Sequence, residues 1–281
     1  MAIPRKEIIK RLQAQVKAGK PFYLQLSHYA SRQGGDATAE ALAAVKARGA
    51  NLNEREIAEA AADLDLDIAL GQLLKKLDEL GIATNTYVIF TTDHGSPGRN
   101  PPLAGGKGTV SEGGLRVPFI IRGPGIQAGA CTHAPAIGED LLPTIAGLAG
   151  VTQDLPKGIE GGSLVPVLTN PAAGTVQRPR EEFVVHFPHY DKDPIGPASA
   201  IYLGSLKLIR VYETGQLKLF DLAKDPGEKH NLAGSEPAQL EEMRAALGRS
   251  YLEAKAHAGA TGQTEVDSVT KDRLKALGYL N

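Results

Sequence analysis

Residues 87–125 read YVIFTTDHGSPGRNPPLAGGKGTVSEGGLRVPFIIRGPG, and this stretch decides the fold. Two apolar runs, 87–91 and 117–121, are rich in strand-forming residues, and a loop rich in glycine and proline separates them over residues 95–114. A broad helical pattern over residues 54–80 precedes them. Helix, strand, long loop, strand is the order of an open α/β sheet, in which ligands bind beyond the carboxyl ends of the strands. The loop is therefore where we expect the chemistry.

The rest of the first half alternates between helix and strand patterns. Apolar residues recur at helical spacing over residues 5–18, and strand-forming residues follow at 22–27. Residues 31–36 are polar and glycine-rich, which predicts a loop. Gly81 is positioned to end the helix over 54–80, and residues 138–150 predict a further helix.

A shift toward Gly, Pro, Ala and Thr over residues 161–179 predicts a domain boundary. We therefore expect an α/β domain at residues 1–170 and a small α+β subdomain at residues 171–281. Short β-like runs separated by turns predict a small antiparallel sheet in the second part, with a helix covering one of its faces. The expected strands are 183–186, 200–203, 206–212 and 216–221, and the expected helices are 237–257 and 269–277.

Composition excludes several classes of protein. Lys and Arg total 31 against 32 for Asp and Glu, so a net charge of -1 provides no general attraction for nucleic acid or an anionic membrane. The single cysteine, Cys131, excludes an internal disulfide, and the redox compartment stays open. The N-terminus lacks the apolar core of a signal peptide, and no later run has the length and apolarity of a membrane span. The sequence predicts a soluble protein.

Three residues of the central stretch could bind ions. Asp93 and His94 follow an apolar strand, where a carboxylate and an imidazole can both turn toward a metal; the same pattern fits a turn with a hydrogen-bonded histidine. Lys107 lies in Gly-Gly-Lys-Gly, where small neighbours let the backbone and the ammonium approach a tetrahedral anion. An exposed lysine in a surface loop is the competing interpretation, and the spacing is not that of a P-loop.

Taken whole, residues 87–125 closely resemble the corresponding region of the formylglycine-dependent sulfatases of the alkaline-phosphatase-like superfamily. The resemblance implies an α/β fold with a mostly parallel sheet flanked by helices, here without its first strands, and a small α+β C-terminal subdomain. It covers nearly the whole chain. Further matching segments are Asp63–Asp65, Leu77–Gly81, Asp140–Thr144, Leu206–Arg210 and Leu219–Leu232.

The resemblance also implies functional roles. Asp93 and His94 would be ligands of calcium, and Lys107 would contact the sulfate of a small-molecule or carbohydrate sulfate ester during hydrolysis. A hard dication and an ammonium together neutralise sulfate oxygens and polarise the sulfur toward attack. Because imidazole is an unusual calcium ligand, His94 leaves room for manganese or zinc. Many family members are exported or periplasmic.

The chain departs from the family at the nucleophile. The family makes formylglycine from the cysteine of Cys-x-Pro-x-Arg or Cys-x-Ala-x-Arg, or from a serine in that setting, and these 281 residues contain no such motif. Cys131 stands in Ala-Cys-Thr-His-Ala-Pro, which predicts a small, at least half-buried side chain. The Asp-Asp strand end that supplies two further metal ligands in the family is also absent. We therefore expect this chain alone to be inactive or nearly so.

A second departure concerns acid catalysis. Where relatives carry a histidine that contacts the substrate or assists the leaving group, this sequence has Arg32, which can bind sulfate with two hydrogen bonds but cannot donate a proton near neutrality. His28 is close by and could compensate, or could simply pack against the strand end. His186 and His189 could reach the mouth of the site from the second domain, or could pack at the domain interface.

Three alternatives stay open at this point. A hydrolase of phosphate or phosphonate esters from the same superfamily would share the metal and anion features. A non-catalytic remnant would bind metal or anion without turnover. A start codon upstream of Met1 would restore an ordinary exported sulfatase.

Overall fold

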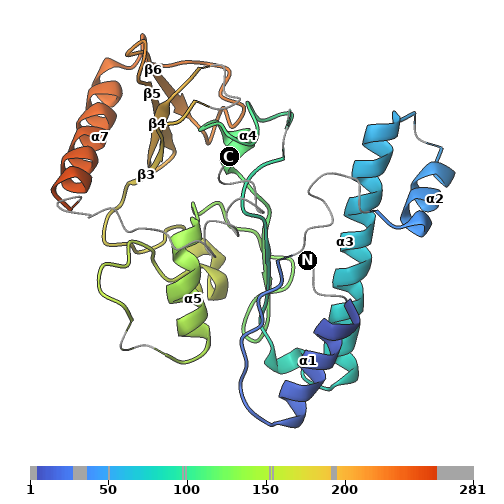
Figure 1. Ribbon diagram of the computed structural model, residues 1–281. Coiled ribbons are helices and arrows are strands. Elements are labelled where there is room, and N and C mark those ends of the chain that lie inside the picture. The colour runs from blue at the N-terminus through green and yellow to red at the C-terminus, as the bar shows by residue number, and fades with distance from the viewer. Residues whose placement is uncertain are drawn as a thin grey trace, which may run out of the picture. The chain divides into compact units, whose positions relative to one another are not determined.

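The structure is a computed structural model that describes residues 5–27, 37–49, 51–96, 98, 100–151, 153, 155–190 and 195–257 (Figure 1). The chain divides into two compact units. The first comprises Met1–Phe90 with Ile120–Ala130, and the second comprises Thr91–Phe119 with Cys131–Asn281.

The first unit is mainly helical. Its elements are α1 (Arg5–Lys17), α2 (Ala39–Ala47), α3 (Glu54–Glu79), the 3-10 turn η1 (Ala83–Asn85), and the strands β1 (Val88–Thr91) and β2 (Phe119–Arg122), which pair with each other. A capping box begins α3: the Asn53 side chain accepts from the Glu56 backbone N–H, and the Glu56 carboxylate accepts from the Asn53 N–H. Gly81 ends the helix as expected, with φ of 69° and the Ile82 N–H donating to the Leu77 carbonyl.

A buried carboxylate joins α2 to α3. Asp65 of α3 is 3% exposed and accepts hydrogen bonds from the Thr38 backbone N–H at 2.6 Å and the Thr38 hydroxyl at 2.9 Å. Thr38 is also the N-cap of α2, so one carboxylate fixes the start of one helix against the middle of the other. Ala41, Val45 and Ala61 fill the small core between the two helices.

The expected mostly parallel sheet is not seen among the described residues, although the α/β content is. The strand expected at residues 22–27 was a wrong prediction: the structure assigns these residues to neither a helix nor a strand, and Tyr23 is 67% exposed. Apolar alternation alone does not make a strand, because its backbone groups need a partner ladder. In the described residues β1 and β2 form a sheet of two strands.

The second unit contains the antiparallel sheet that the sequence predicted. Strands β3 (Phe183–Phe187), β4 (Ala198–Leu203), β5 (Leu206–Val211) and β6 (Leu217–Asp221) pair in that order, all antiparallel. The remaining elements are α4 (Glu112–Leu115), η2 (Gly138–Asp140), α5 (Leu141–Leu148), α6 (Val165–Thr169), η3 (Pro171–Ala173) and α7 (Pro237–His257). The helices expected over 138–150 and 237–257 are thus confirmed.

The two faces of this sheet pack against different partners, with α7 on one side and α4 on the other (Figure 1). Ile201, Leu208 and Leu219 share the first face and pack on Met243 and Leu247 of α7. The opposite face packs against the segment that contains α4. Its buried core is Val110, Ala198, Ala200, Tyr202, Ile209, Val211 and Phe220.

A buried ion pair stabilises the helical part of this unit. Asp140 is fully buried and accepts from Arg178 Nε at 2.9 Å and from the Gly162 and Ile137 backbone N–H groups. Thr144 likewise accepts from the Leu164 N–H. The resemblance over Asp140–Thr144 therefore corresponds to structural polar groups, each satisfied by a partner.

Some predictions fall outside the described residues or are not tested. The loop over 31–36 and the helix over 269–277 lie outside the described part of the chain. The boundary near residue 170 stays a prediction. None of the helices in the described part has the length and apolarity that crossing a bilayer requires.

Candidate anion and metal site

The loop after β1 folds back on itself through backbone hydrogen bonds. The Gly95 N–H donates to the Gly114 carbonyl at 2.9 Å, the Lys107 N–H donates to the Ser96 carbonyl at 3.0 Å, and the Gly113 N–H donates to the Ala104 carbonyl at 2.7 Å. The Asn100 side-chain amide adds a bond to the Gly113 carbonyl. The loop is therefore cross-linked along its length, although most of it is neither helix nor strand.

Two glycines of this loop allow backbone segments to approach closely. A Cβ on Gly106 would collide with the carbonyl oxygens of Gly98 and Ser96, and a Cβ on Gly113 would collide with those of Ala104 and Gly105. Since both collisions are with backbone atoms, no side-chain rearrangement relieves them. Glycine at these positions is required by the packing of the loop.

Lys107 stands at the turn of this loop with its side chain exposed. Its backbone N–H is bound to Ser96, but its ammonium has no hydrogen bond or ion pair within the described part of the chain. A fixed backbone carrying a free ammonium is suited to binding an anion, because the backbone needs little reordering when the anion arrives. Such an arrangement suits a tetrahedral anion such as sulfate or phosphate.

Asp93 and His94 lie at the carboxyl end of β1, three and two residues before Ser96. His94 Nδ1 is 2.8 Å from the Gly95 carbonyl oxygen, which can only accept, so Nδ1 carries the hydrogen. In neutral imidazole Nε2 is then left with a lone pair, and it lies 3.3 Å from Asp93 Oδ2. A lone pair of the imidazole and a carboxylate oxygen therefore lie close together, which is an arrangement that a bound cation can use.

These two residues fit a divalent cation in part. The Nδ1 contact with a carbonyl is the arrangement that orients a metal-binding histidine, and the carboxylate suits calcium. Within the described residues no third His, Cys, Asp or Glu completes a cluster with them. A metal bound here would therefore need further ligands, from water, from substrate or from other residues.

The structure describes only some of the other predicted site residues. His28 and Arg32 lie outside the described residues. His189 is exposed, and its ring packs edge-on against Phe187 with centroids 5.4 Å apart. His186 Nδ1 lies 2.6 Å from the Ser199 hydroxyl, which gives it a structural partner on the sheet. Cys131 is exposed, so the prediction that it is at least half buried was wrong.

A buried polar cluster beside the loop was not predicted from the sequence. Lys207 is fully buried and lies between the carboxylates of Glu112 and Glu228, at 3.0 and 2.8 Å. The available signal was periodicity: Lys207 alternates with Ile209 and Val211, so it occupies an inward-facing position of the strand. A lysine at such a position needs a carboxylate partner, and the sequence does not say which.

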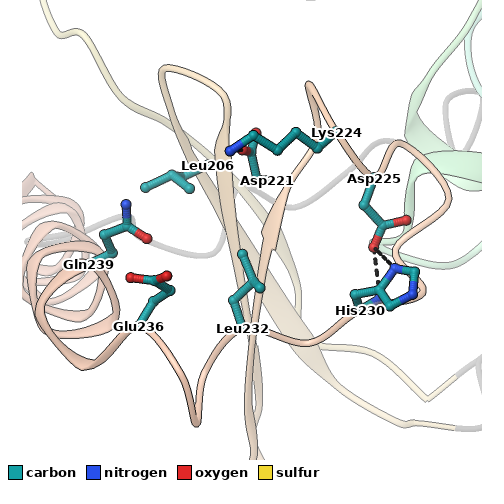
Figure 2. Close-up of a pocket in the computed structure, with 8 residues that line it drawn as sticks. All are labelled: Leu206, Asp221, Lys224, Asp225, His230, Leu232, Glu236 and Gln239. Atoms are coloured by element: carbon teal, nitrogen blue, oxygen red, sulfur yellow. Dashed lines mark hydrogen bonds and ion pairs between the residues drawn. The ribbon is translucent and has the colours of Figure 1, made fainter.

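A shallow pocket of about 330 Å³ lies beside β6 and α7 in the same unit (Figure 2). Two carboxylates of its lining, Asp221 and Asp225, already have partners. Lys224 lies 3.0 Å from Asp221 and lowers the pKa of that carboxyl. Burial would raise the pKa of Asp225, but hydrogen bonds from the His230 and Lys229 backbone outweigh it, so the pKa is lowered. None of the predicted site residues lines this pocket.

Comparison with known families covers most of the chain. The Sulfatase family model matches residues 4–151. The chain belongs to the sulfatase family. A second model, described as N-sulphoglucosamine sulphohydrolase, C-terminal, matches residues 106–256 of this sulfatase-family chain. The predicted family is thereby confirmed.

Curated sulfatases align with part of the chain. It is 33% identical to arylsulfatase A of Homo sapiens over 219 residues, which covers 67% of this chain and 41% of that protein. It is 31% identical to steryl-sulfatase of Rattus norvegicus, over 64% of this chain and 37% of that one. It is 34% identical to an ulvan-active sulfatase of Formosa agariphila, over 66% of this chain and 37% of that protein. The sulfatase-family chain thus spans about two fifths of these relatives.

Solved structures share its fold. The crystal structure of Ps i-CgsB has a TM-score of 0.77 at 23% identity and covers 97% of this chain and 58% of that one. The structure of BT4656 in complex with its substrate D-glucosamine-2-N,6-O-disulfate has a TM-score of 0.56 at 25% identity and covers 76% and 46%. The sulfatase-like fold expected from the sequence is confirmed at this level.

The close packing of the loop makes a matched pair of glycine substitutions informative. Gly106→Ala should lower the free energy of unfolding by about 1–3 kcal/mol, because its Cβ meets backbone oxygens. Gly248→Ala in α7 meets nothing within 4 Å and should raise it by about 0.5–1 kcal/mol. Urea unfolding followed by circular dichroism measures both. Equal effects of the two substitutions would contradict the packing described for the loop.

Proposed function

We propose that this chain carries the sulfate-contacting lysine and part of the calcium site of an enzyme that hydrolyses sulfuric esters. The observation that carries the proposal is Lys107: its exposed ammonium has no partner among the described residues and stands on a cross-linked loop, the same loop that holds Asp93 and His94. Family membership supports sulfate as the anion.

In this proposal the chain's own residues bind and orient the sulfate group. Lys107 donates to a sulfate oxygen, and the exclusion of side chains from Gly106 keeps its loop backbone in place. Asp93 and His94 Nε2 would hold calcium, or manganese or zinc, and the bound cation would neutralise charge on the sulfate oxygens. The family's formylglycine does not fit the residues present, because neither Cys131 nor any serine of these 281 residues stands in the required motif.

The remaining site residues are proposed on the resemblance alone. Arg32 would bind a sulfate oxygen pair, His28 would assist the leaving group, and His189 would contact the substrate. We also propose the division into an α/β domain at residues 1–170, with a mostly parallel sheet in the whole protein, and a C-terminal subdomain at residues 171–281. The shift in composition over 161–179, followed by β3 at Phe183, supports this boundary.

A carbohydrate sulfate is the substrate class that we propose first. One structural relative was solved with a disulfated glucosamine, one curated relative is described as ulvan-active, and one matching family model is that of N-sulphoglucosamine sulphohydrolase. Aryl esters are the second class, on the strength of arylsulfatase A. An assay panel of sulfated saccharides, aryl sulfates and the matching phosphate esters separates these classes in the whole enzyme.

Removing the Lys107 ammonium should weaken sulfate binding. In titration calorimetry with sodium sulfate, Lys107→Ala should raise Kd by about tenfold or more, since a hydrogen bond to a charged group contributes about 1.5–3 kcal/mol. Lys157→Ala is the control, because Lys157 is also an exposed lysine of the second unit. If both variants bind sulfate like the unaltered chain, Lys107 is not the anion contact. Sodium phosphate in parallel tests the phosphate-ester alternative.

Metal binding should depend on Asp93. Asp93→Asn removes the charged ligand and should abolish calorimetrically detectable calcium binding, whereas the exposed carboxylate of Asp67 in α3 can be changed to Asn without effect. His94→Ala should weaken zinc and manganese more than calcium, because imidazole prefers the transition metals. Calcium binding that survives Asp93→Asn would argue against this site.

The chain alone should bind without turning over. We expect the purified 281-residue protein to release no sulfate from an aryl sulfate ester, because it has no formylglycine motif. Ion chromatography of the reaction mixture measures free sulfate directly. Sulfate release at rates typical of an enzyme would refute this expectation and would require a different nucleophile within the chain. Sulfate binding without release is the result that also favours a non-catalytic binding role for the isolated chain.

A further inference from the structure

The segment that follows Lys107 is attached to the C-terminal sheet by a buried carboxylate. Glu112 begins α4 and is 5% exposed. Its Oε1 accepts from the Tyr202 hydroxyl of β4 at 2.8 Å and from Lys207 Nζ of β5 at 3.0 Å. Arg116 Nη1 lies 3.9 Å from the other oxygen. Two strands of the sheet therefore meet the helix that ends the loop.

Glu228, in the turn after β6, closes this arrangement from the opposite side. Its Oε2 accepts from the Glu112 backbone N–H at 2.8 Å, and its Oε1 lies 2.8 Å from Lys207 Nζ. Among the residues that the structure describes, Glu228 is the one non-glycine residue with a positive φ, at 54°. A non-glycine residue is held in this conformation only when its surroundings fix it. The strained backbone places the carboxylate so that it accepts a hydrogen bond from the helix start and forms an ion pair with the ammonium.

Neighbouring contacts add two more attachments. Val110 is 1% exposed and belongs to the core of the sheet, together with Leu115 at its edge. A Cβ on Gly227 would come within 2.9 Å of the Pro102 carbonyl oxygen, so the turn after β6 also lies against the beginning of the loop. The loop is thus attached before and after Lys107, while the Lys107 side chain is exposed.

The electrostatics of the cluster favour a role in positioning α4 over a role in stabilising the fold. Lys207 is fully buried, with its ammonium 5.0 Å from the centre of the Tyr202 ring. Burial and the neighbouring Glu112 carboxylate raise the pKa of Tyr202, so its hydroxyl stays a neutral donor. Buried ion pairs are costly to desolvate, and apolar replacements of similar size are often as stable. What the ions provide, and apolar groups do not, is a directional attachment of α4 to the sheet.

We propose that Glu112, Lys207 and Glu228, aided by Tyr202, are positioning residues for the sulfate site: they act through the loop backbone and hold Lys107 where it binds the anion. None of the four needs to touch sulfate. This inference rests on the proposed function in taking Lys107 as the anion contact. In this inference, contacts made by the C-terminal sheet contribute to the affinity of Lys107 for sulfate.

The test compares two substitutions in the full 281-residue chain. Glu228→Gln keeps the shape of the side chain but removes the charge that faces Lys207. Leu208→Val is the matched control. Leu208 follows Lys207 in β5, is as fully buried as Lys207, and faces α7 on the other side of the sheet. Glu228→Gln should raise the Kd for sodium sulfate by about tenfold, while Leu208→Val should leave it within about twofold at the same folded fraction.

Hydrogen exchange of the backbone provides the second measurement. Amides of residues 104–111 should exchange faster in Glu228→Gln than in Leu208→Val when both are compared at equal global stability. If Glu228→Gln does not fold, Tyr202→Phe removes a single hydroxyl donor and should shift both readouts in the same direction by a smaller amount. Equal sulfate affinity and equal exchange in the two variants would overturn the proposal.

Failure of the proposed function gives a different pattern. If the unaltered chain does not bind sulfate, Lys107 is not an anion contact, and the exchange experiment alone decides the positioning role. Faster exchange confined to residues 104–111 in Glu228→Gln would then support positioning of the loop. Exchange that rises throughout the second unit in both variants would show that the cluster contributes only general stability.

Discussion

Lys207 imposes the main constraint on the second unit, because a fully buried ammonium must be neutralised where it stands. The two carboxylates that do so come from different parts of the chain, one from the start of α4 and one from the turn after β6. Their contacts force the sheet, the turn and the loop to adopt one relative position. The sheet in turn takes its shape from apolar packing on both faces, so the ionic cluster selects which segment covers the second face.

The loop beside this cluster separates rigidity from reactivity. Its backbone is bound by cross-loop hydrogen bonds and by glycines that leave no room for side chains, whereas the ammonium of Lys107 is exposed. At the carboxyl end of β1, the tautomer of His94 is set by the Gly95 carbonyl. In both places main-chain atoms orient a side chain whose functional atom remains available. This division is what a binding site for a small, highly charged anion requires.

Local signals in the sequence were sufficient for much of the fold. Strands β3 to β6 and helix α7 lie where alternation and helical periodicity predicted them, and Gly81 ends α3 because only the residue and its neighbours decide that turn. The position of the loop was predicted for the same reason. The prediction of a strand at 22–27 was wrong because the pairing of a strand depends on residues that are distant in the sequence. Helix α4 was missed because two of its four residues are glycine, and it forms where Glu228 accepts its first N–H. The partners of Lys207 left no local pattern at all.

The separation of these partners along the chain has a consequence for assembly. Glu112 is 90 residues from Tyr202, 95 from Lys207 and 116 from Glu228, so each contact closes a long loop of polypeptide. Contacts of such range form late, because the entropy of closure is lost before the contact is gained. During synthesis the residues around Lys107 leave the ribosome long before the turn that holds Glu228. The segment proposed to recognise the anion therefore acquires its final conformation only once the C-terminal strands exist, which couples completion of the chain to completion of the site.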